Sequence, residues 1–319
     1  MMRSMFSLIR REFAAYFQSP IAYVVLAVFL LVTGHLFALT LNQLTESGPR
    51  GVEFPMMILL GDERFWLVFL FIPPLLTMRL LAEERGSGTL EMLMTAPIRD
   101  WEVVLAKYIA CYAFYIVLWL PTLLYLPILL NLQAVWDWHA WTLFSGMMVG
   151  GLGLLVILFF VALPLGMSFF NMFLMLLIGG TLYGVGCWMH YHKDAAHLVE
   201  LTAKIDPFPI LTSYIGVLLA GGMFLALGMF VSSLVRSQMV AALISLILSL
   251  IFIVTGFWRP EMDTASLTYR ILLYFSVPLH FSKDFTRGLL DSREILFYLS
   301  TTIFFLFMTI RSLESRRWR

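Results

Sequence analysis

Three neighbouring histidines are the residues of this sequence that suggest a metal site. His190, His192 and His197 lie in the stretch W-M-H-Y-H-K-D-A-A-H, and imidazoles at this spacing could ligate a metal ion if the loop folded back on itself. No cysteine or carboxylate lies at a familiar ligand spacing beside them. We therefore favour a wet interfacial loop, in which Trp188 and Tyr191 are aromatic anchors, and predict no metal site.

The sequence lacks the motifs of the common catalytic sites. A phosphate-binding P-loop requires G-x-x-x-x-G-K-[ST], and no lysine in this chain follows a glycine. The sequence also lacks H-E-x-x-H and G-x-S-x-G, and no apolar run contains a pair of carboxylates. We therefore expect no catalytic residue, no cofactor bound by this chain and no nucleic-acid partner.

Two polar side chains stand out because they lie within long apolar runs. His35 lies near the end of the first run, and Asn171 lies in the fifth. Polar or ionisable groups at such depth usually face a cavity or a protein partner. Contact with a substrate is one interpretation of these residues, and a hydrogen bond between helices is the favoured one.

The composition identifies the environment of these residues as a membrane. Of the 319 residues, 61% are hydrophobic and 13% are charged, and the mean hydropathy is +0.88. A soluble domain has roughly 25% charged residues. One core of this size cannot bury so large an apolar surplus, so we predict a polytopic protein surrounded by lipid. Both cysteines, Cys111 and Cys187, lie in apolar runs, where we interpret them as small buried hydrophobic residues.

The apolar runs predict an all-α transmembrane bundle of about eight spans, because about 20 residues are needed to cross a ~30 Å hydrocarbon core. The predicted spans are 20–41, 64–82, 103–130, 142–163, 166–188, 212–233, 237–257 and 293–311. Pro121 and Pro127 predict a kink or tilt in the third span. Because only Leu163-Pro164-Leu165 separates the fourth and fifth spans, a re-entrant hairpin is the alternative there.

The flanking charges predict that both termini are cytoplasmic. Arginines cluster before the first span and after the last, as expected for cytoplasmic flanks. Residues 2–18 also form a helical wheel with an apolar face and a basic face, which predicts an interfacial helix. The residues placed on the apolar face are Met2, Met5, Phe6, Ile9, Phe13 and Tyr16.

Segment 258–292 is too polar to cross the membrane, so we predict short interfacial helices there, which act as a passive lid or as a gate on the external side.

The polar interruption at 83–100 predicts a short cytoplasmic helix between two spans. Gly86 and Gly88 break the preceding helix, Thr89 can cap the next one, and Leu90 and Leu93 share one face with Met94. A helix of under three turns is marginal in water, which favours docking into a groove of a partner. A capped connector on the membrane is the alternative. The predicted docking residues are Glu83, Glu84, Arg85, Gly86, Gly88, Thr89, Leu90, Glu91 and Leu93.

Small residues line one side of the sixth predicted span. Gly216, Ala220, Gly228 and Ser232 recur at helix-packing spacing, interrupted by Phe224. Small residues let membrane helices approach closely. We predict that this stripe packs within one chain, with packing between two subunits as the alternative.

The same interruption carries a family resemblance. The pattern E-E-R-G-S-G-T-L-E-M-L-M-T-A-P-I at 83–98, followed by W-E-V-V-L-A-K at 101–107, resembles the signature of ABC-2 type permeases, the membrane subunits of ATP-driven transporters. The gliding-motility-associated permeases are the most similar group. Further similar stretches are A-L-G-M-F-V-S-S-L-V-R-S-Q-M-V-A-A at 226–242, H-F-S-K-D-F-T-R-G-L-L-D-S-R-E-I-L-F-Y-L-S at 280–300 and R-S-L-E-S-R-R-W at 311–318.

The resemblance implies how such a chain works. Residues 89–96 would be a coupling helix that docks on a separate ATP-binding subunit, which would use ATP and Mg²⁺, and residues 2–18 would be an elbow helix. A second copy or a sister permease would complete the complex in a bacterial inner membrane, and transport would be outward. Family permeases have six spans, so segment 135–205 resembles a pair of spans added to the family pattern. The alternative from another class is a membrane anchor or scaffold that transports nothing.

Overall fold

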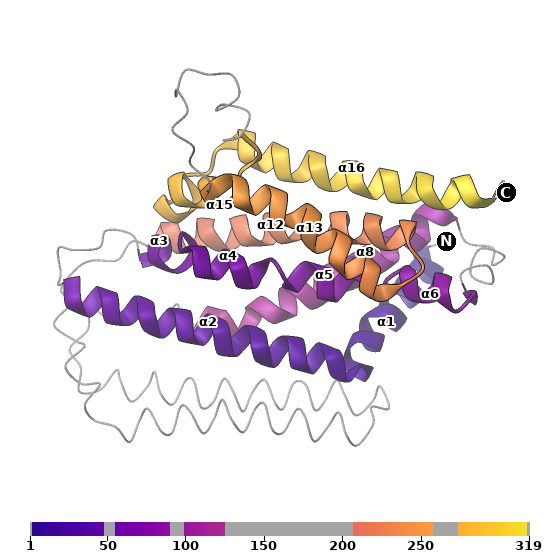
Figure 1. Ribbon diagram of the computed structural model, residues 1–319, viewed down its shortest axis with the longest axis horizontal. Coiled ribbons are helices and arrows are strands. Elements are labelled where there is room, and N and C mark those ends of the chain that lie inside the picture. The colour runs from indigo at the N-terminus through magenta and orange to yellow at the C-terminus, as the bar shows by residue number, and fades with distance from the viewer. Residues whose placement is uncertain (1, 48–54, 90–98, 125–206, 258–273, 318–319) are drawn as a thin grey trace. The chain divides into compact units, whose positions relative to one another are not determined.

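The computed structural model describes residues 2–47, 55–89, 99–124, 207–257 and 274–317, and all regular elements in these ranges are helices (Figure 1). The longer ones are α1 (Met2–Gln18), α2 (Pro20–Ser47), α8 (Asp100–Trp119), α12 (Pro207–Leu234), α13 (Gln238–Phe257) and α16 (Ser292–Arg317). The shorter ones are α3 (Pro55–Leu60), α4 (Glu63–Phe69), α5 (Ile72–Thr77), α6 (Ala82–Gly86), η1 (Leu120–Leu124), α15 (Val277–Lys283) and η4 (Phe285–Arg287).

Five helices in the described ranges are long and apolar enough to cross a membrane. They are Ala22–Thr40, Asp100–Leu123, Phe208–Leu234, Gln238–Thr255 and Ser292–Ser315. The described residues therefore confirm the all-α class of a multi-pass membrane protein. The predicted spans 142–163 and 166–188, segment 135–205 and the histidine stretch lie outside the described residues.

The predicted span 64–82 is a broken pair of helices. The α4 helix ends at Phe69, and α5 restarts at Ile72. Pro73 and Pro74 lie in the first turn of α5, where their missing N–H groups need no partner, whereas inside a longer helix each would remove a backbone hydrogen bond. The apolar composition of this segment did not predict the break.

The chain divides into two compact units. The first comprises Met1–Phe13, Met56–Ile116 and Phe208–Arg319, and the second comprises Ala14–Pro55 and Val117–Pro207. In the second unit, Phe29 of α2 meets Trp119 edge to face with ring centroids 5.0 Å apart. The third predicted span changes there from α8 to η1, which contains Pro121, at the position of the predicted kink.

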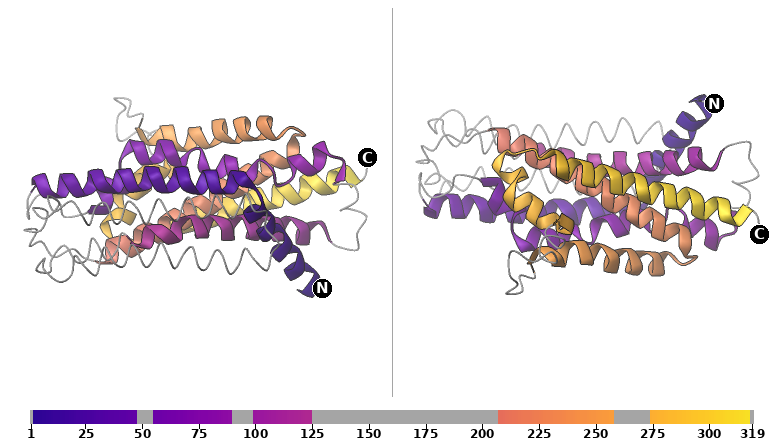
Figure 2. Two further views of the ribbon diagram at one scale, coloured as in Figure 1. Left: turned by 90° about the horizontal axis from the view of Figure 1, so that it is seen from below. Right: turned by 90° about the horizontal axis from the view of Figure 1, so that it is seen from above.

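Helix α12 is the central helix of the first unit. In its candidate membrane span 78% of the residues are buried, against 22% in the spans of α13 and α16. These three long helices run along a common direction in each view (Figures 1 and 2). Close approach to α12 depends on glycine, because a Cβ atom at Gly221 would collide with the Tyr115 ring and one at Gly228 with the Thr77 side chain.

A ladder of three tyrosines joins α8 to α12. Tyr108, Tyr112 and Tyr115 recur at helical spacing, and adjacent rings in the ladder are stacked. Their hydroxyl groups donate hydrogen bonds to backbone carbonyls of α12: Tyr108 to Gly222 (3.1 Å), Tyr112 to Leu218 (3.2 Å) and Tyr115 to Val217 (3.0 Å). Each carbonyl has a second lone pair available, so the ladder adds to the helix's own bonding.

The described part of segment 258–292 packs into the core of the first unit. Phe281 of α15 and Phe285 of η4 are fully buried, and Phe281 meets Trp66 with ring centroids 4.9 Å apart. Thr212 of α12 donates a 2.6 Å hydrogen bond to the Phe285 carbonyl. The short helices predicted here are present, but these two aromatic side chains lie inside the protein.

Candidate functional site

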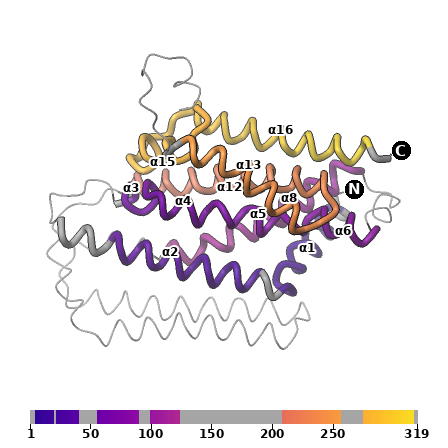
Figure 3. The backbone as a smooth tube through the Cα atoms, viewed as in Figure 1, coloured from indigo at the N-terminus to yellow at the C-terminus, as the bar shows by residue number. Residues whose placement is uncertain are grey.

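The described part of the predicted docking segment is α6, which lies at the same end of the first unit as the C-terminus of α16, whereas α15 lies at the other end (Figures 1 and 3). A five-residue helix is too short to be stable alone. The contacts that hold α6 in place therefore decide how the segment after it is presented.

The first turn of α6 is capped by a side chain from α12. Backbone N–H groups at the start of a helix have no partner within the helix. The N–H groups of Leu81 and Ala82 donate to Ser232 Oγ at 3.1 and 3.0 Å, and Ser232 is fully buried. Ser232 Oγ also donates to the Met78 carbonyl at 3.4 Å. The hydroxyl thus acts as an N-cap supplied by a distant part of the chain.

The other end of α6 is attached to the C-terminal end of α12. Arg85 Nη1 donates to the Ser233 carbonyl at 2.6 Å and to the Val235 carbonyl at 3.4 Å. The carbonyls at a helix C-terminus carry partial negative charge and favour a cation. A Cβ atom at Gly86 would lie 3.0 Å from the Arg236 carbonyl oxygen, so glycine permits this close approach.

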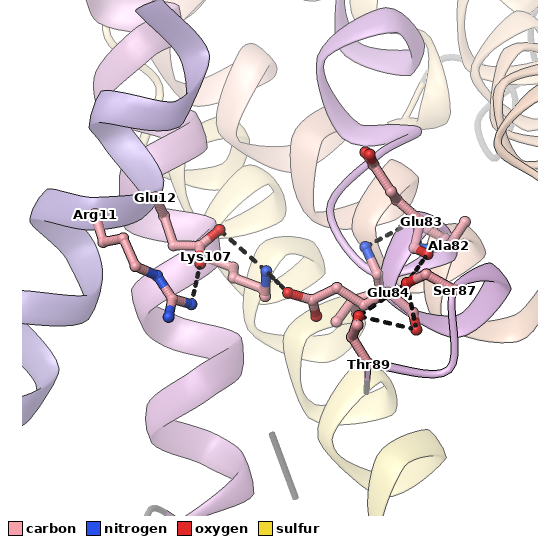
Figure 4. Close-up of polar contacts among 10 residues, drawn as sticks. Arg11, Glu12, Ala82, Glu83, Glu84, Ser87, Thr89 and Lys107 are labelled. Atoms are coloured by element: carbon pink, nitrogen blue, oxygen red, sulfur yellow. Dashed lines mark hydrogen bonds and ion pairs between the residues drawn. The ribbon is translucent and has the colours of Figure 1, made fainter. Parts of the chain in front are cut away.

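A buried lysine of α8 joins α6 to α1. Lys107 Nζ donates to Glu84 Oε1 at 2.8 Å and to Glu12 Oε2 at 3.0 Å, while Arg11 forms a further 2.8 Å ion pair with Glu12 (Figure 4). The Lys107 side chain is 3% exposed, against 15% for Glu12 and 23% for Glu84. Burying an ammonium group is costly unless it is paired, and here two carboxylates meet it.

The pairing lowers the pKa of Glu12. Burial raises the pKa of the Glu12 carboxyl, but the attraction of Lys107 and the hydrogen bonds from Arg11 and Lys107 act in the opposite direction. The net result is a pKa below the ordinary value for glutamate. Glu12 is therefore ionised in the folded protein at neutral pH.

Apolar contacts support the same junction. Leu8 of α1 is buried against Val103 and Ala106 of α8, with Met5 and Ile9 packed beside them. The predicted apolar face of α1 omitted Leu8 and included Phe6, which is 70% exposed. The contact with α8 therefore lies along one edge of the predicted apolar face, where Met5 and Ile9 lie beside Leu8.

Local hydrogen bonds flank the docking segment on both sides. Helix α8 begins at Asp100, and Glu102 Oε2 accepts a 3.1 Å hydrogen bond from the Arg99 N–H, as in a capping box. The Thr89 hydroxyl lies 2.8 Å from Ser87 Oγ and contacts the Glu84 carbonyl at 3.5 Å, so it faces back toward α6.

The exposed members of the predicted set lie on and just after α6. Glu83, Gly86, Gly88 and Thr89 are exposed, and Gly88 has φ 73°, a conformation that suits glycine. Leu90, Glu91 and Leu93 lie outside the described residues.

The remaining predicted residues lie at separate positions. Ala220 is fully buried on α12, a Cβ at Gly216 would lie 2.8 Å from the Phe285 ring, and His35 of α2 is exposed. Asn171 lies outside the described residues.

Sequence reasoning missed Glu12 and Lys107 as partners. Glu12 is the one carboxylate in the basic helix 2–18, and Lys107 is the one lysine among the described spans, so each was a visible exception to its surroundings. Neither exception indicates a partner 95 residues away along the chain.

Comparison with known proteins identifies the family. The family model described as ABC-2 family transporter protein matches residues 52–237, which is more than half of the chain and includes α6 and all of α8. No curated protein matches the chain. With a multi-pass helical fold and this match, the chain belongs to the ABC-2 family of transporter proteins and is a membrane component of an ABC transporter.

Proposed function

We propose that this protein is the permease subunit of an ATP-driven exporter of the gliding-motility-associated group. A separate ATP-binding subunit, using ATP and Mg²⁺, would dock on residues 83–93 and drive movement of a substrate out across a bacterial inner membrane. A second permease copy or a sister permease would complete the complex, as the family resemblance implies.

The observation that carries this proposal is the way α6 is held. Ser232 and Arg85 attach it to the end of α12, and Lys107 attaches it to α1 and α8. A plain connector would need no such set of buried polar contacts. Contacts on both sides of α6 suit a segment that must stay attached to the permease when the partner subunit moves it.

The test is purification with the native ATP-binding subunit in mild detergent, followed by an ATPase assay. We expect a stoichiometric subunit and ATP turnover that the permease stimulates. Leu90→Asp/Leu93→Asp replaces two apolar knobs by charges and is expected to abolish the stimulation, since hydrophobic anchors in a groove carry most of the binding energy.

A matched control separates loss of docking from loss of folding. Leu289→Asp/Leu290→Asp makes the same change at two leucines that are 57% and 43% exposed beyond η4. We expect this variant to insert into the membrane and to stimulate ATP turnover normally. Normal stimulation by the Leu90→Asp/Leu93→Asp variant would contradict the proposal, and failure to recover any ATP-binding subunit would favour the anchor or scaffold.

A further inference from the structure

A single ammonium group connects three elements that are far apart in the sequence. Glu84 lies 23 residues from Lys107 and Glu12 lies 95 residues from it, yet both carboxylates are within 3.0 Å of Lys107 Nζ. Figure 4 shows Nζ between the two carboxylates, with Glu12 on one side and Glu84 on the other. The contact therefore depends on the placement of α1, α6 and α8 together.

The charges of this group balance. Arg11 and Lys107 supply two positive charges, and Glu12 and Glu84 supply two negative charges. Because Lys107 is the least exposed of the four, removing its charge would leave two partly buried carboxylates facing each other without their cation. The electrostatic part of the cost of separating these elements therefore depends on the Lys107 side chain.

The two sides of α6 are anchored by different chemistry. Toward α12 the anchors are hydrogen bonds that α6 donates to a neutral hydroxyl and to backbone carbonyls, and they hold α6 at its ends. Toward α1 and α8 the described anchor is the Glu84–Lys107 ion pair. Without that pair α6 would keep its cap but lose its tie to α1.

We propose that Lys107 is a positioning residue for energy coupling: by holding Glu84 and Glu12 together it makes α1, α6 and the start of α8 move as one body when the ATP-binding subunit engages the segment after α6. This inference rests on the proposed function, because it needs a partner at that segment. It assigns the transmission of the movement to one buried ammonium group.

The first experiment compares ATP turnover in the purified complex. Lys107→Met keeps much of the side-chain length and removes the charge, and we expect permease-stimulated turnover to fall by about tenfold or more, since a small misplacement of a remote group can cost that much. Lys107→Arg retains the positive charge and is expected to keep most of the stimulation. Lys283→Met, at an exposed lysine of α15, is the matched control and is expected to have no effect.

A second variant separates positioning from folding. Glu12→Gln/Glu84→Gln/Lys107→Met removes all three charges, so no unpaired charge remains buried. We expect this variant to insert and to retain the ATP-binding subunit, but to stay as poorly stimulated as Lys107→Met. Full stimulation by the triple variant would overturn the proposal, because the ion pairs would then be dispensable for coupling.

A distance measurement reports the relative positions of α1 and α6, which a measurement of stability does not. Spin labels at Ser7→Cys in α1 and Ser87→Cys after α6, in a Cys111→Ala/Cys187→Ala background, report the separation of the two elements. We expect a narrow distance distribution in the parent and in Lys107→Arg, and a broad one in Lys107→Met. An equally narrow distribution in Lys107→Met would overturn the proposal.

The outcomes also distinguish this inference from the proposed function. If Leu90→Asp/Leu93→Asp abolishes stimulation while Lys107→Met leaves it unchanged, docking on the segment stands and the role of Lys107 is wrong. If neither change affects ATP turnover, the docking proposal itself fails.

Discussion

At the scale of single residues, the junction of α1, α6 and α8 depends on charge. Lys107 is nearly as buried as the apolar residues around it, and two carboxylates approach it from different elements. Apolar contacts of Leu8 with Val103 and Ala106 shield the junction and strengthen its electrostatics. The buried polar group of Lys107 therefore has a structural role, because it joins α1 and α6 to α8.

The lowered pKa of Glu12 gives a prediction at this scale. Because the carboxyl has a lower pKa in the folded state than in the unfolded chain, its contribution to stability is fully present above the unfolded pKa and is lost as the pH falls through the folded pKa. As the pH is lowered below 4.5, the ordinary pKa of glutamate, we expect the melting temperature of the detergent-solubilised protein to decrease. We expect this decrease to be less steep for Glu12→Gln. Melting curves from pH 3 to 8 test this. Identical slopes for the two proteins would show that Glu12 is not the group responsible.

At the scale of elements, α12 organises its unit because small residues let other elements approach it. The tyrosine ladder of α8, the ring of Phe285 and the side chain of Thr77 all meet α12 at or beside glycines. Between apolar helices in a membrane there is little hydrophobic driving force, so close packing and hydrogen bonds must hold them. The stripe predicted from sequence, Gly216 to Ser232, lies within these contacts.

Gly228→Ala tests the packing of α12. Alanine gains about 1 kcal/mol of helix propensity over glycine, but the added methyl group collides with Thr77, and overpacking costs about 1–3 kcal/mol. We expect net destabilisation, measured as a lower melting temperature in detergent. Gly222→Ala is the comparison, since its nearest neighbour is the Tyr108 hydroxyl at 3.1 Å, the far end of a side chain that can shift. A larger loss at Gly222 than at Gly228 would contradict this account.

At the scale of the whole molecule, the basic flanks and the α6 region predict one orientation in the membrane. Residues 83–100 and both termini are expected on the cytoplasmic side, and the segment between α13 and α16 on the external side. Helix α16 joins the two ends of the first unit, with its C-terminus at the end that holds α6 (Figure 1).

Cysteine labelling tests this orientation. In a Cys111→Ala/Cys187→Ala background, Leu289→Cys is expected to react with a membrane-impermeant thiol reagent in intact spheroplasts. Ser87→Cys is expected to react only after the membrane is opened, and both positions are exposed in the structure. Protection of Leu289→Cys together with labelling of Ser87→Cys in intact spheroplasts would reverse the predicted orientation.

The sequence by itself determined the class of the protein, because the apolar surplus and the length of each apolar run follow directly from residue types. It also predicted α1, the long helices and the polar break after Gly86, since helical periodicity and glycine act locally. The family resemblance on 83–107 lies within the matched range 52–237.

Only the tertiary structure decided which residues meet. Contacts between distant segments decide the packing face of α1, the cap that Ser232 supplies to α6 and the pairing of Lys107 with Glu12. A local pattern cannot specify such contacts, because each requires that several helices already lie in place. The sequence therefore identified the polar break as the place to look, and the fold assigned Lys107 to its centre.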